Sequence, residues 1–229
     1  MPMIRALGLV PRSAKISPQQ FHLHWAIIHS RLAEEVQAIR RYVQFHGTTE
    51  NLGTFAPPSY EGIAEAWFDD IPSLTALATD PYFTEVIKRD EKNFLDHSRD
   101  GMFVVAEDVK LEGPTLTRGH PFHKAMLLVN KNPDVRTTDF RIWWNDVLPD
   151  LALREIPGIA RYVQSLPVDE MYTDGEPPFD AVMEIWRGDP ASPENEPPGL
   201  DEFVAALGAN SPIDISRTSA TVGTEFRIR

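Results

Sequence analysis

The chain has 229 residues, 42% of them hydrophobic and 24% charged, which is typical of a folded soluble protein with one large or two small domains. Its formal net charge of −12 argues against nucleic acid or an anionic membrane as a partner, and the lack of cysteine excludes disulfides, thiolate nucleophiles and cysteine metal sites. We expect a cytoplasmic protein, because the N-terminal segment is interrupted too soon for a signal peptide and no apolar run approaches the roughly 18 residues of a membrane helix.

The first half of the chain predicts the order strand, helix, two strands, helix, strand. A weakly alternating strand at 4–11 precedes Ser17, an N-cap residue that is followed by proline at the first helical position. A helix should then run to about Ala38, because apolar residues recur at helical spacing. The remaining expected elements are strands at 40–46 and 62–70, helices at 73–78 and 81–96, and a strand at 101–109.

The second half repeats the first. The motif "RYVQ" at Arg41 recurs 120 residues later at Arg161, and "YEGIAEAWFDD" at 60–70 recurs 119 residues later as "FDAVMEIWRGD". This half should contain strands at 124–131 and 221–229 and a helix at 201–208, with the Pro-rich stretch 188–199 replacing part of its last helical region. The expected organisation is a first repeat at 1–111, a linker at 112–120 and a second repeat at 121–229.

The element order of each half, βαββαβ, is that of a ferredoxin-like unit. Such a unit has helices on one face of a four-stranded antiparallel sheet and leaves the other face bare. Two fused units can bury these bare faces against each other. The predicted fold is therefore α+β, an intrachain pseudo-dimeric α+β barrel, and a homodimer of this two-repeat chain is a further assembly that the sequence allows.

Four segments of the first half, "F..HW...H" at 21–29, "RYVQFH" at 41–46, "YEGIAEAWFDD" at 60–70 and "DEKNFLDH" at 90–97, resemble the EthD domain family of dimeric α+β barrel proteins. The second half resembles a degenerate copy that lacks the helix-one histidine and a good copy of "DEKNFLD". The resemblance implies that the histidine of "W...H", His29, works in a pocket between helices and sheet. It also implies no metal or organic cofactor, since most relatives, among them muconolactone isomerases, polyketide cyclases and anthrone-type oxygenases, work without one.

The helix-one histidines do not predict a metal site. At about 100° per residue, His29 lies at the edge of the buried stripe, His22 lies farther out and His24 lies on the opposite flank. The counterpart of His29 in the second half is Leu148, so the fold does not require histidine at that position. The alternative to a catalytic His29 is a boundary histidine that is hydrogen-bonded to backbone.

The second catalytic candidate is His46, whose counterpart is the apolar Leu166. Tyr42, Gln44 and His46 share one strand face by the period of two. If that face looks at helix one, His46 and His29 could flank a substrate. The alternative is an exposed loop histidine.

Two further candidates, Glu65 and Trp67, recur as Glu184 and Trp186, which also fits a structural role. Glu65 is expected to be either ion-paired at the barrel interface or an acid of raised pKa. The predicted substrate-binding residues are Trp25, Tyr42, Glu65 and Trp67.

No GxGxxG, GxxxxGKS/T or GxSxG motif occurs, so a nucleotide cofactor and a hydrolase nucleophile elbow have no support. The sequence predicts a cofactor-independent enzyme in which His29, helped by His46, is the general acid and base. Its substrate would be a small, largely apolar aromatic, lactone or polyketide-type molecule, and its reaction an isomerisation, an elimination or decarboxylation, or a cyclisation. The alternatives are a cofactor-free monooxygenase acting on a phenol or anthrone-like molecule, and a non-catalytic binding protein.

Overall fold

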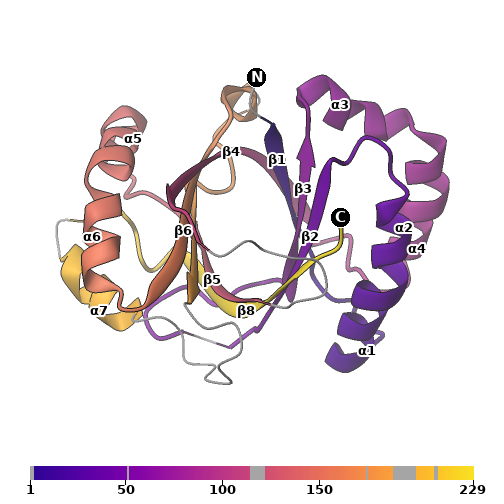
Figure 1. Ribbon diagram of the computed structural model, residues 1–229, viewed down its shortest axis with the longest axis horizontal. Helices are drawn as coiled ribbons and strands as arrows, with labels where there is room; N and C mark the ends of the chain where they lie inside the picture. The colour runs from indigo at the N-terminus through magenta and orange to yellow at the C-terminus, as the bar shows by residue number, and fades with distance from the viewer. Residues whose placement is uncertain (1–2, 51, 114–121, 174, 188–199, 209–210) are drawn as a thin grey trace.

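The computed structural model describes residues 3–50, 52–113, 122–173, 175–187, 200–208 and 211–229. Its strands form a closed antiparallel barrel, and helices lie on two opposite sides of that barrel (Figure 1). The strands are β1 (Ile4–Leu9), β2 (Arg41–Gly47), β3 (Gly62–Phe68), β4 (Gly101–Leu111), β5 (Phe122–Val129), β6 (Ile159–Pro167), β7 (Ala181–Arg187) and β8 (Ser219–Arg227).

The helices of the first half cover one side of the barrel, and the α-helices of the second half cover the other. The first-half α-helices are α1 (Pro18–Leu23), α2 (Ser30–Glu34), α3 (Ile71–Thr75) and α4 (Lys88–Glu91). They are joined by two π-helical segments, η1 (His24–His29) and η3 (Phe83–Ile87), and by the 3-10 helix η2 (Ala76–Thr79). The second half contributes α5 (Thr137–Asp146), α6 (Leu148–Glu155), the 3-10 helix η4 (Asp169–Tyr172) and α7 (Leu200–Leu207).

The order of the strands around the barrel is β1-β3-β2-β8-β5-β7-β6-β4. The first four strands thus run β4-β1-β3-β2, and the last four run β8-β5-β7-β6. Pairing of β2 with β8 and of β4 with β6 closes the barrel. The predicted α+β barrel is confirmed, while residues 114–120 of the predicted linker and the Pro-rich stretch 188–199 lie outside the described residues.

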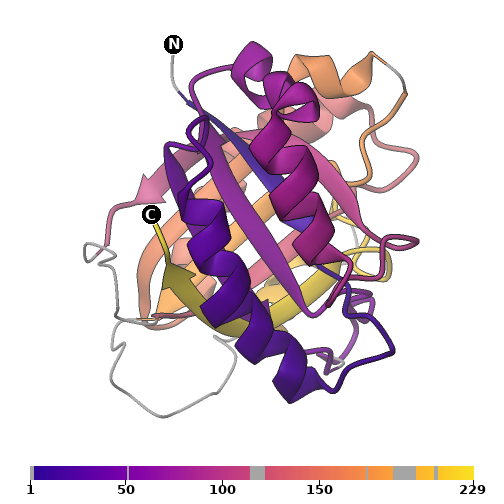
Figure 2. The ribbon, with the colours of Figure 1, turned by 90° about the vertical axis from the view of Figure 1, so that its right-hand side faces the viewer.

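Strand side chains alternate between the barrel interior and the outer, helix-covered face, as the period of two requires. On β1, Arg5 and Leu7 project inward, whereas Ala6 and Gly8 face the first-half helices. Figure 2 shows the first-half helices lying across the outer face of these strands. Both faces of the sheet are therefore covered, which accounts for the nearly continuous burial of the strands.

The first helical stretch begins at a capping box, in which the Ser17 hydroxyl accepts from the Gln20 backbone N–H and the Gln20 side chain accepts from the Ser17 N–H. It ends at Glu34, four residues earlier than predicted. The reason is a pair of tighter i to i+3 hydrogen bonds, from Val36 N–H to Ala33 and from Ile39 N–H to Val36. None of the described helices has the length and apolar character needed to span a membrane.

Candidate active site

A cavity of about 710 Å³ lies between the first-half helices and the outer face of β1, β2, β3 and β4. Most of its walls are aliphatic or aromatic, and the volume is in the range of sites for drug-sized ligands. Of the predicted site residues, Trp25, His29 and Tyr42 line this cavity together. The cavity therefore lies where the EthD resemblance implied a pocket.

Small residues on the sheet create the space. On β1 and β3, four residues of the sheet wall have little or no side chain: Ala6, Gly8, Ala64 and Ala66. In the matching registers of the second half, where β5 pairs with β7 as β1 pairs with β3, Ala6 matches Ala125, but the other three equivalents are large: Leu127, Met183 and Ile185. The same backbone arrangement can thus leave room on one side and none on the other.

The corresponding space in the second half is filled by a tightly buried apolar cluster. Helices α5 and α7 and the end of α6 contribute Phe140, Trp144, Ile156 and Phe203 to it. Leu148, the counterpart of His29, has no exposed surface and belongs to this cluster. Among the described residues, the two halves therefore differ: apolar side chains pack between helix and sheet in the second half, where the first half has a cavity.

His29 is positioned by a carboxylate from a different helix. Only 6% of its surface is exposed, and its Nδ1 lies 3.0 Å from Oδ2 of Asp90, which is on α4. Its ring also packs edge-on against Phe94, with 5.0 Å between ring centroids. Because Asp90 engages Nδ1, the carboxylate favours the tautomer with a proton on Nδ1 and leaves Nε2 to act as a base.

The π-helical segment brings a second histidine to the same carboxylate. Nε2 of His24 lies 2.9 Å from Oδ1 of Asp90, so His24 and His29 share one partner. The prediction that these two side chains diverge is wrong. It assumed α-helical geometry, whereas η1 has i to i+5 hydrogen bonds, as from Ser30 N–H to the Trp25 carbonyl, so residues five apart lie on one side.

The histidine pair keeps Asp90 ionised. Burial acts to raise the pKa of this carboxyl, but the hydrogen bond from His29 and the charge and hydrogen bond of His24 outweigh it and lower the value. An ionised Asp90 can orient the His29 ring and stabilise its imidazolium form. A carboxylate, a buried histidine and an adjoining apolar cavity form an arrangement suited to proton transfer.

Tyr42 is held by the face of β2 that looks at helix one. The Gln44 amide donates to the Trp25 carbonyl at 2.9 Å and to the Tyr42 hydroxyl at 3.4 Å. Burial, opposed by hydrogen bonds from Gln44 and Trp25, raises the pKa of Tyr42 to about 12, so its hydroxyl is a neutral donor. The Trp25 ring lies close against the strand because residue 62 is glycine, where a Cβ would clash with that ring.

His46 lies on this strand face as predicted, but it does not line the cavity. Its Nδ1 is 2.9 Å from Nδ1 of His22, its Nε2 is 3.1 Å from Oε1 of Gln44, and its ring packs on Trp25 with 4.3 Å between centroids. Burial and then the charge of His22 lower the pKa of His46 to about 3. The structure thus places His46 against Trp25 rather than opposite His29 across the cavity.

Glu65 and Trp67 project into the barrel instead of the cavity, because alternate residues of β3 face opposite sides. The Trp67 indole donates to Oε1 of Glu107 at 3.0 Å, and the Arg41 guanidinium lies 4.1 Å from its ring centroid. The predicted grouping of Glu65 and Trp67 with Trp25 around one substrate therefore differs from the observed geometry.

Glu65 belongs to an ion network that links the two halves inside the barrel. Lys124 lies 2.5 Å from Glu65, 2.8 Å from Glu184 and 2.6 Å from Glu225. Arg5 lies 2.9 Å from Glu65 and 2.5 Å from Glu184. Glu65 was expected to be ion-paired or to have a raised pKa, and it shows both properties.

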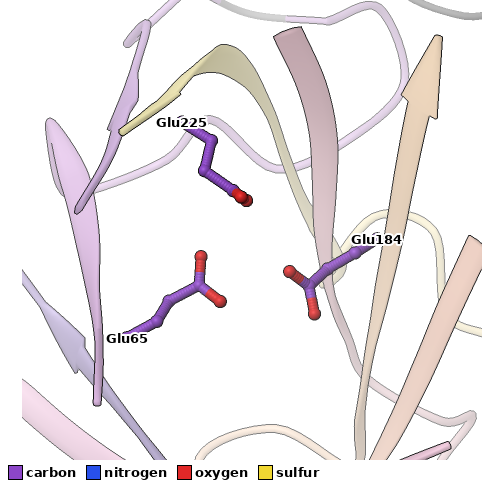
Figure 3. A group of neighbouring side chains, drawn as sticks. All are labelled: Glu65, Glu184 and Glu225. Atoms are coloured by element: carbon purple, nitrogen blue, oxygen red, sulfur yellow. The ribbon is translucent and has the colours of Figure 1, made fainter. Parts of the chain in front are cut away.

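The network is short of positive charge, because Glu107, 3.6 Å from Arg5, adds a fourth carboxylate against the two cations. Figure 3 shows the other three, Glu65, Glu184 and Glu225. Burial raises the pKa of Glu65, whereas Arg5 and Lys124 outweigh burial at Glu184 and lower its pKa. The three glutamates point toward one another and are close enough to suit a metal ion. The Lys124 ammonium already contacts all three, so it supplies the cation at that point.

Sequence reasoning missed Asp90, Arg5 and Lys124 as partners of the candidate residues. Asp90 opens the segment "DEKNFLD", and the second half lacks good copies of both this segment and the helix-one histidine. That joint loss is a signal that the two belong together. Arg5 and Lys124 occupy equivalent registers, opposite Trp67 and Trp186, which an alignment of the two first strands would have shown.

Residues 13–98 match the family model of the EthD domain, which confirms the predicted family for this part of the chain. An EthD-family protein from Bacillus halodurans matches at 14% identity, covering 45% of this chain and 96% of that chain, with a TM-score of 0.38. No curated protein matches the sequence.

Several solved structures match across nearly the whole chain, including the following two. An anthrone oxidase-like protein is 8% identical, with 99% of this chain and 93% of that chain covered and a TM-score of 0.59. A chlorite dismutase variant from Candidatus Nitrospira defluvii is 7% identical, with 99% and 92% covered and a TM-score of 0.55. At such identities these matches show a shared α+β barrel fold.

Proposed function

We propose that this chain, whose residues 13–98 are an EthD domain, is a cofactor-independent enzyme that uses His29 as general acid and base on a small, largely apolar substrate. The observation that carries the proposal is the Asp90–His29 pair at the wall of the apolar cavity. Substrates of this kind include aromatic ketones, lactones and polyketide-type molecules. The reaction class is isomerisation, elimination, decarboxylation or cyclisation next to a carbonyl.

The proton movements follow from the positions of three groups. In a substrate that also has a C=C bond one carbon farther on, Nε2 of His29 removes a proton from the carbon between the carbonyl and the C=C bond, and the electron pair of that C–H bond moves into a conjugated dienolate. The neutral Tyr42 hydroxyl donates a hydrogen bond to the enolate oxygen, where negative charge develops. The imidazolium, stabilised by Asp90, then returns the proton to a different carbon, which completes an isomerisation without a net change in protons.

His46 takes a different role in this proposal from the one predicted. Its ring packs on Trp25, and its low pKa keeps it neutral near pH 7. We propose that it positions Trp25 at the cavity wall. Glu65 and Trp67, which project into the barrel, are assigned to barrel closure instead of substrate binding.

The architecture is part of the same proposal. We infer that the barrel is two fused ferredoxin-like units, a first repeat at 1–111 and a degenerate second repeat at 121–229. The identical strand order of the two halves and the equivalent registers of β1 with β3 and β5 with β7 support this inference. The first repeat keeps the acid-base pair, and the second forms the other side of the barrel.

A cofactor-free oxygenation is the second candidate. In that reaction His29 would deprotonate a phenol or anthrone-like molecule, whose electron-rich anion reacts with O₂ directly. The aromatic side chains beside His29 in the cavity favour such a flat substrate. A non-catalytic binding protein would need the aromatic walls but not the ion-paired histidine.

Deuterium incorporation tests the proposal. Candidate ketones and lactones are incubated with the protein in D₂O, and exchange of the proton next to the carbonyl is followed by mass spectrometry while an oxygen electrode records O₂ uptake. His29→Ala should slow exchange by about 100-fold or more, the usual contribution of a general base. His123→Ala, a half-buried histidine of the second half, is the matched control and should exchange at the wild-type rate. Unchanged exchange in His29→Ala would remove His29 as the base.

A further inference from the structure

We propose that the cavity selects uncharged ligands and excludes carboxylates, because its rim is acidic and none of the described residues that line it offers a free cation. This inference rests on the proposed function in that it narrows the substrate class of the same site, and it removes decarboxylation, whose substrates carry a carboxylate, from the reactions proposed there. The inference depends on the charged residues that line the cavity, none of which takes part in the proposed proton transfer.

Among the described residues that line the cavity, Lys88 is the sole lysine or arginine. Its ammonium lies 2.8 Å from Oε2 of Glu91, so its charge is already paired. Asp100, whose Oδ2 lies 2.8 Å from Nδ1 of His97, and Glu170 also line the cavity, which gives three acids against one lysine. The rim therefore repels anions.

The interior makes the exclusion stronger. A carboxylate that enters an apolar cavity loses its water, and this costs several kcal/mol unless a cation or several donors replace that water. Nδ1 of His29 is taken by Asp90, and Tyr42 offers one neutral donor. One neutral hydrogen bond suffices for a ketone or phenol oxygen but not for a carboxylate.

Part of this rim comes from the second half of the chain. The 3-10 helix η4 brings Glu170 and Met171 to the cavity. Arg141 anchors η4, since its guanidinium lies 5.2 Å from the Tyr172 ring centroid and 3.6 Å from Asp169. The second half therefore contributes a fixed negative charge to a site that is otherwise built by the first half.

Three naphthalene derivatives of similar shape test the inference: 2-acetylnaphthalene, which is neutral, 2-naphthoate, which is anionic, and 2-(aminomethyl)naphthalene, which is cationic. Titration calorimetry at pH 7 with the full chain gives their Kd values. We expect the ketone to bind at least about 10-fold tighter than the carboxylate, because the carboxylate loses its favourable hydration when it enters the cavity. The Kd of the ammonium should lie between the other two, because the ammonium also loses hydration but is attracted by the acidic rim.

The ratio of the ammonium Kd to the carboxylate Kd isolates the sign of the rim charge. Glu170→Lys should raise this ratio by about two- to five-fold, because it weakens ammonium binding relative to carboxylate binding; this is the range of exposed charge interactions. Asp134→Lys makes the same change in net charge at an exposed residue that does not line the cavity, and it should leave the ratio unchanged. An equal shift in both variants would assign the effect to net charge and overturn the role of the rim.

Binding of 2-naphthoate as tight as that of the ketone would overturn the proposal, and so would failure of all three probes to bind at millimolar concentration. These outcomes are separate from failure of the proposed function. If the ketone is preferred but His29→Ala exchanges deuterium like the wild type, the selectivity stands and the acid-base role falls. If the carboxylate is preferred but His29→Ala is inactive, the reverse holds.

Discussion

Exchanging one residue between the two halves should change stability in opposite directions. Ala66→Ile places the second-half residue at the cavity wall, and Ile185→Ala makes the reverse change at the equivalent register. Ala66→Ile adds three carbons to a space of about 710 Å³. At about 0.8 kcal/mol per buried methylene, this substitution should stabilise the fold by up to about 2 kcal/mol. Ile185 has no exposed surface, so Ile185→Ala should cost about 2–5 kcal/mol.

Urea unfolding of the two variants and the wild type measures these free energies, and calorimetry with 2-acetylnaphthalene measures what remains of the binding site. Ala66→Ile should weaken probe binding while raising the urea midpoint. Ile185→Ala should lower the midpoint and leave probe binding unchanged. If Ala66→Ile instead destabilises the protein by the 1–3 kcal/mol typical of overpacking, the cavity is not open in solution, and the reasoning fails.

Three further predictions concern the ionisable groups. His29→Leu should abolish turnover with little loss of stability. Leu148→His should instead destabilise the fully buried second-half cluster by about 1–3 kcal/mol and leave activity intact. Steady-state kinetics and urea unfolding measure both effects, and equal activity loss in the two variants would contradict a single site. Because the pKa of His46 is lowered to about 3, its contribution to stability is fully present above the unfolded value near 6.5 and is lost as the pH falls. Between pH 6.5 and 5 the wild type should therefore lose about 2 kcal/mol more than His46→Gln does, and parallel pH profiles of unfolding would contradict this. Lys124→Met should destabilise the barrel by about 3–5 kcal/mol because it strands buried carboxylates, and a neutral result in thermal unfolding would show that the network is not required.

The barrel could be predicted from sequence because its signals are local and repeated. Each strand has its own alternation, Ser17 and Pro18 give the helix start, and the recurrence of "RYVQ" and "EIW"-like blocks predicts two repeats. The face shared by Tyr42, Gln44 and His46 also followed from the period of two, and its contact with helix one is observed. These inferences need only the neighbours of a residue along the chain.

The geometry of the site could not be predicted, because it depends on contacts distant in sequence and on one change of helical register. Asp90 lies 61 residues from His29, and no local pattern pairs them. The π-helical turn rotates His24 to the side of His29, and a wheel drawn at α-helical spacing has no means of showing it. The cavity itself follows from Ala64 and Ala66, small residues whose meaning appears only when they are compared with their large counterparts.

The histidine, its carboxylate and the cavity are physically linked features, so there is a simple reason why the described residues of the second half show none of the three. An imidazole buried among apolar side chains needs a hydrogen-bond partner, and a half without an equivalent of Asp90 would pay for an unsatisfied polar group there. Leu148 avoids that cost, and once it is present the large side chains of Met183 and Ile185 can fill the remaining space. The second half is stabilised by burying large apolar side chains between helix and sheet, and the first half lacks this stabilisation where the cavity lies. A single chain can therefore keep one space for a ligand while the other side of the barrel supplies stability.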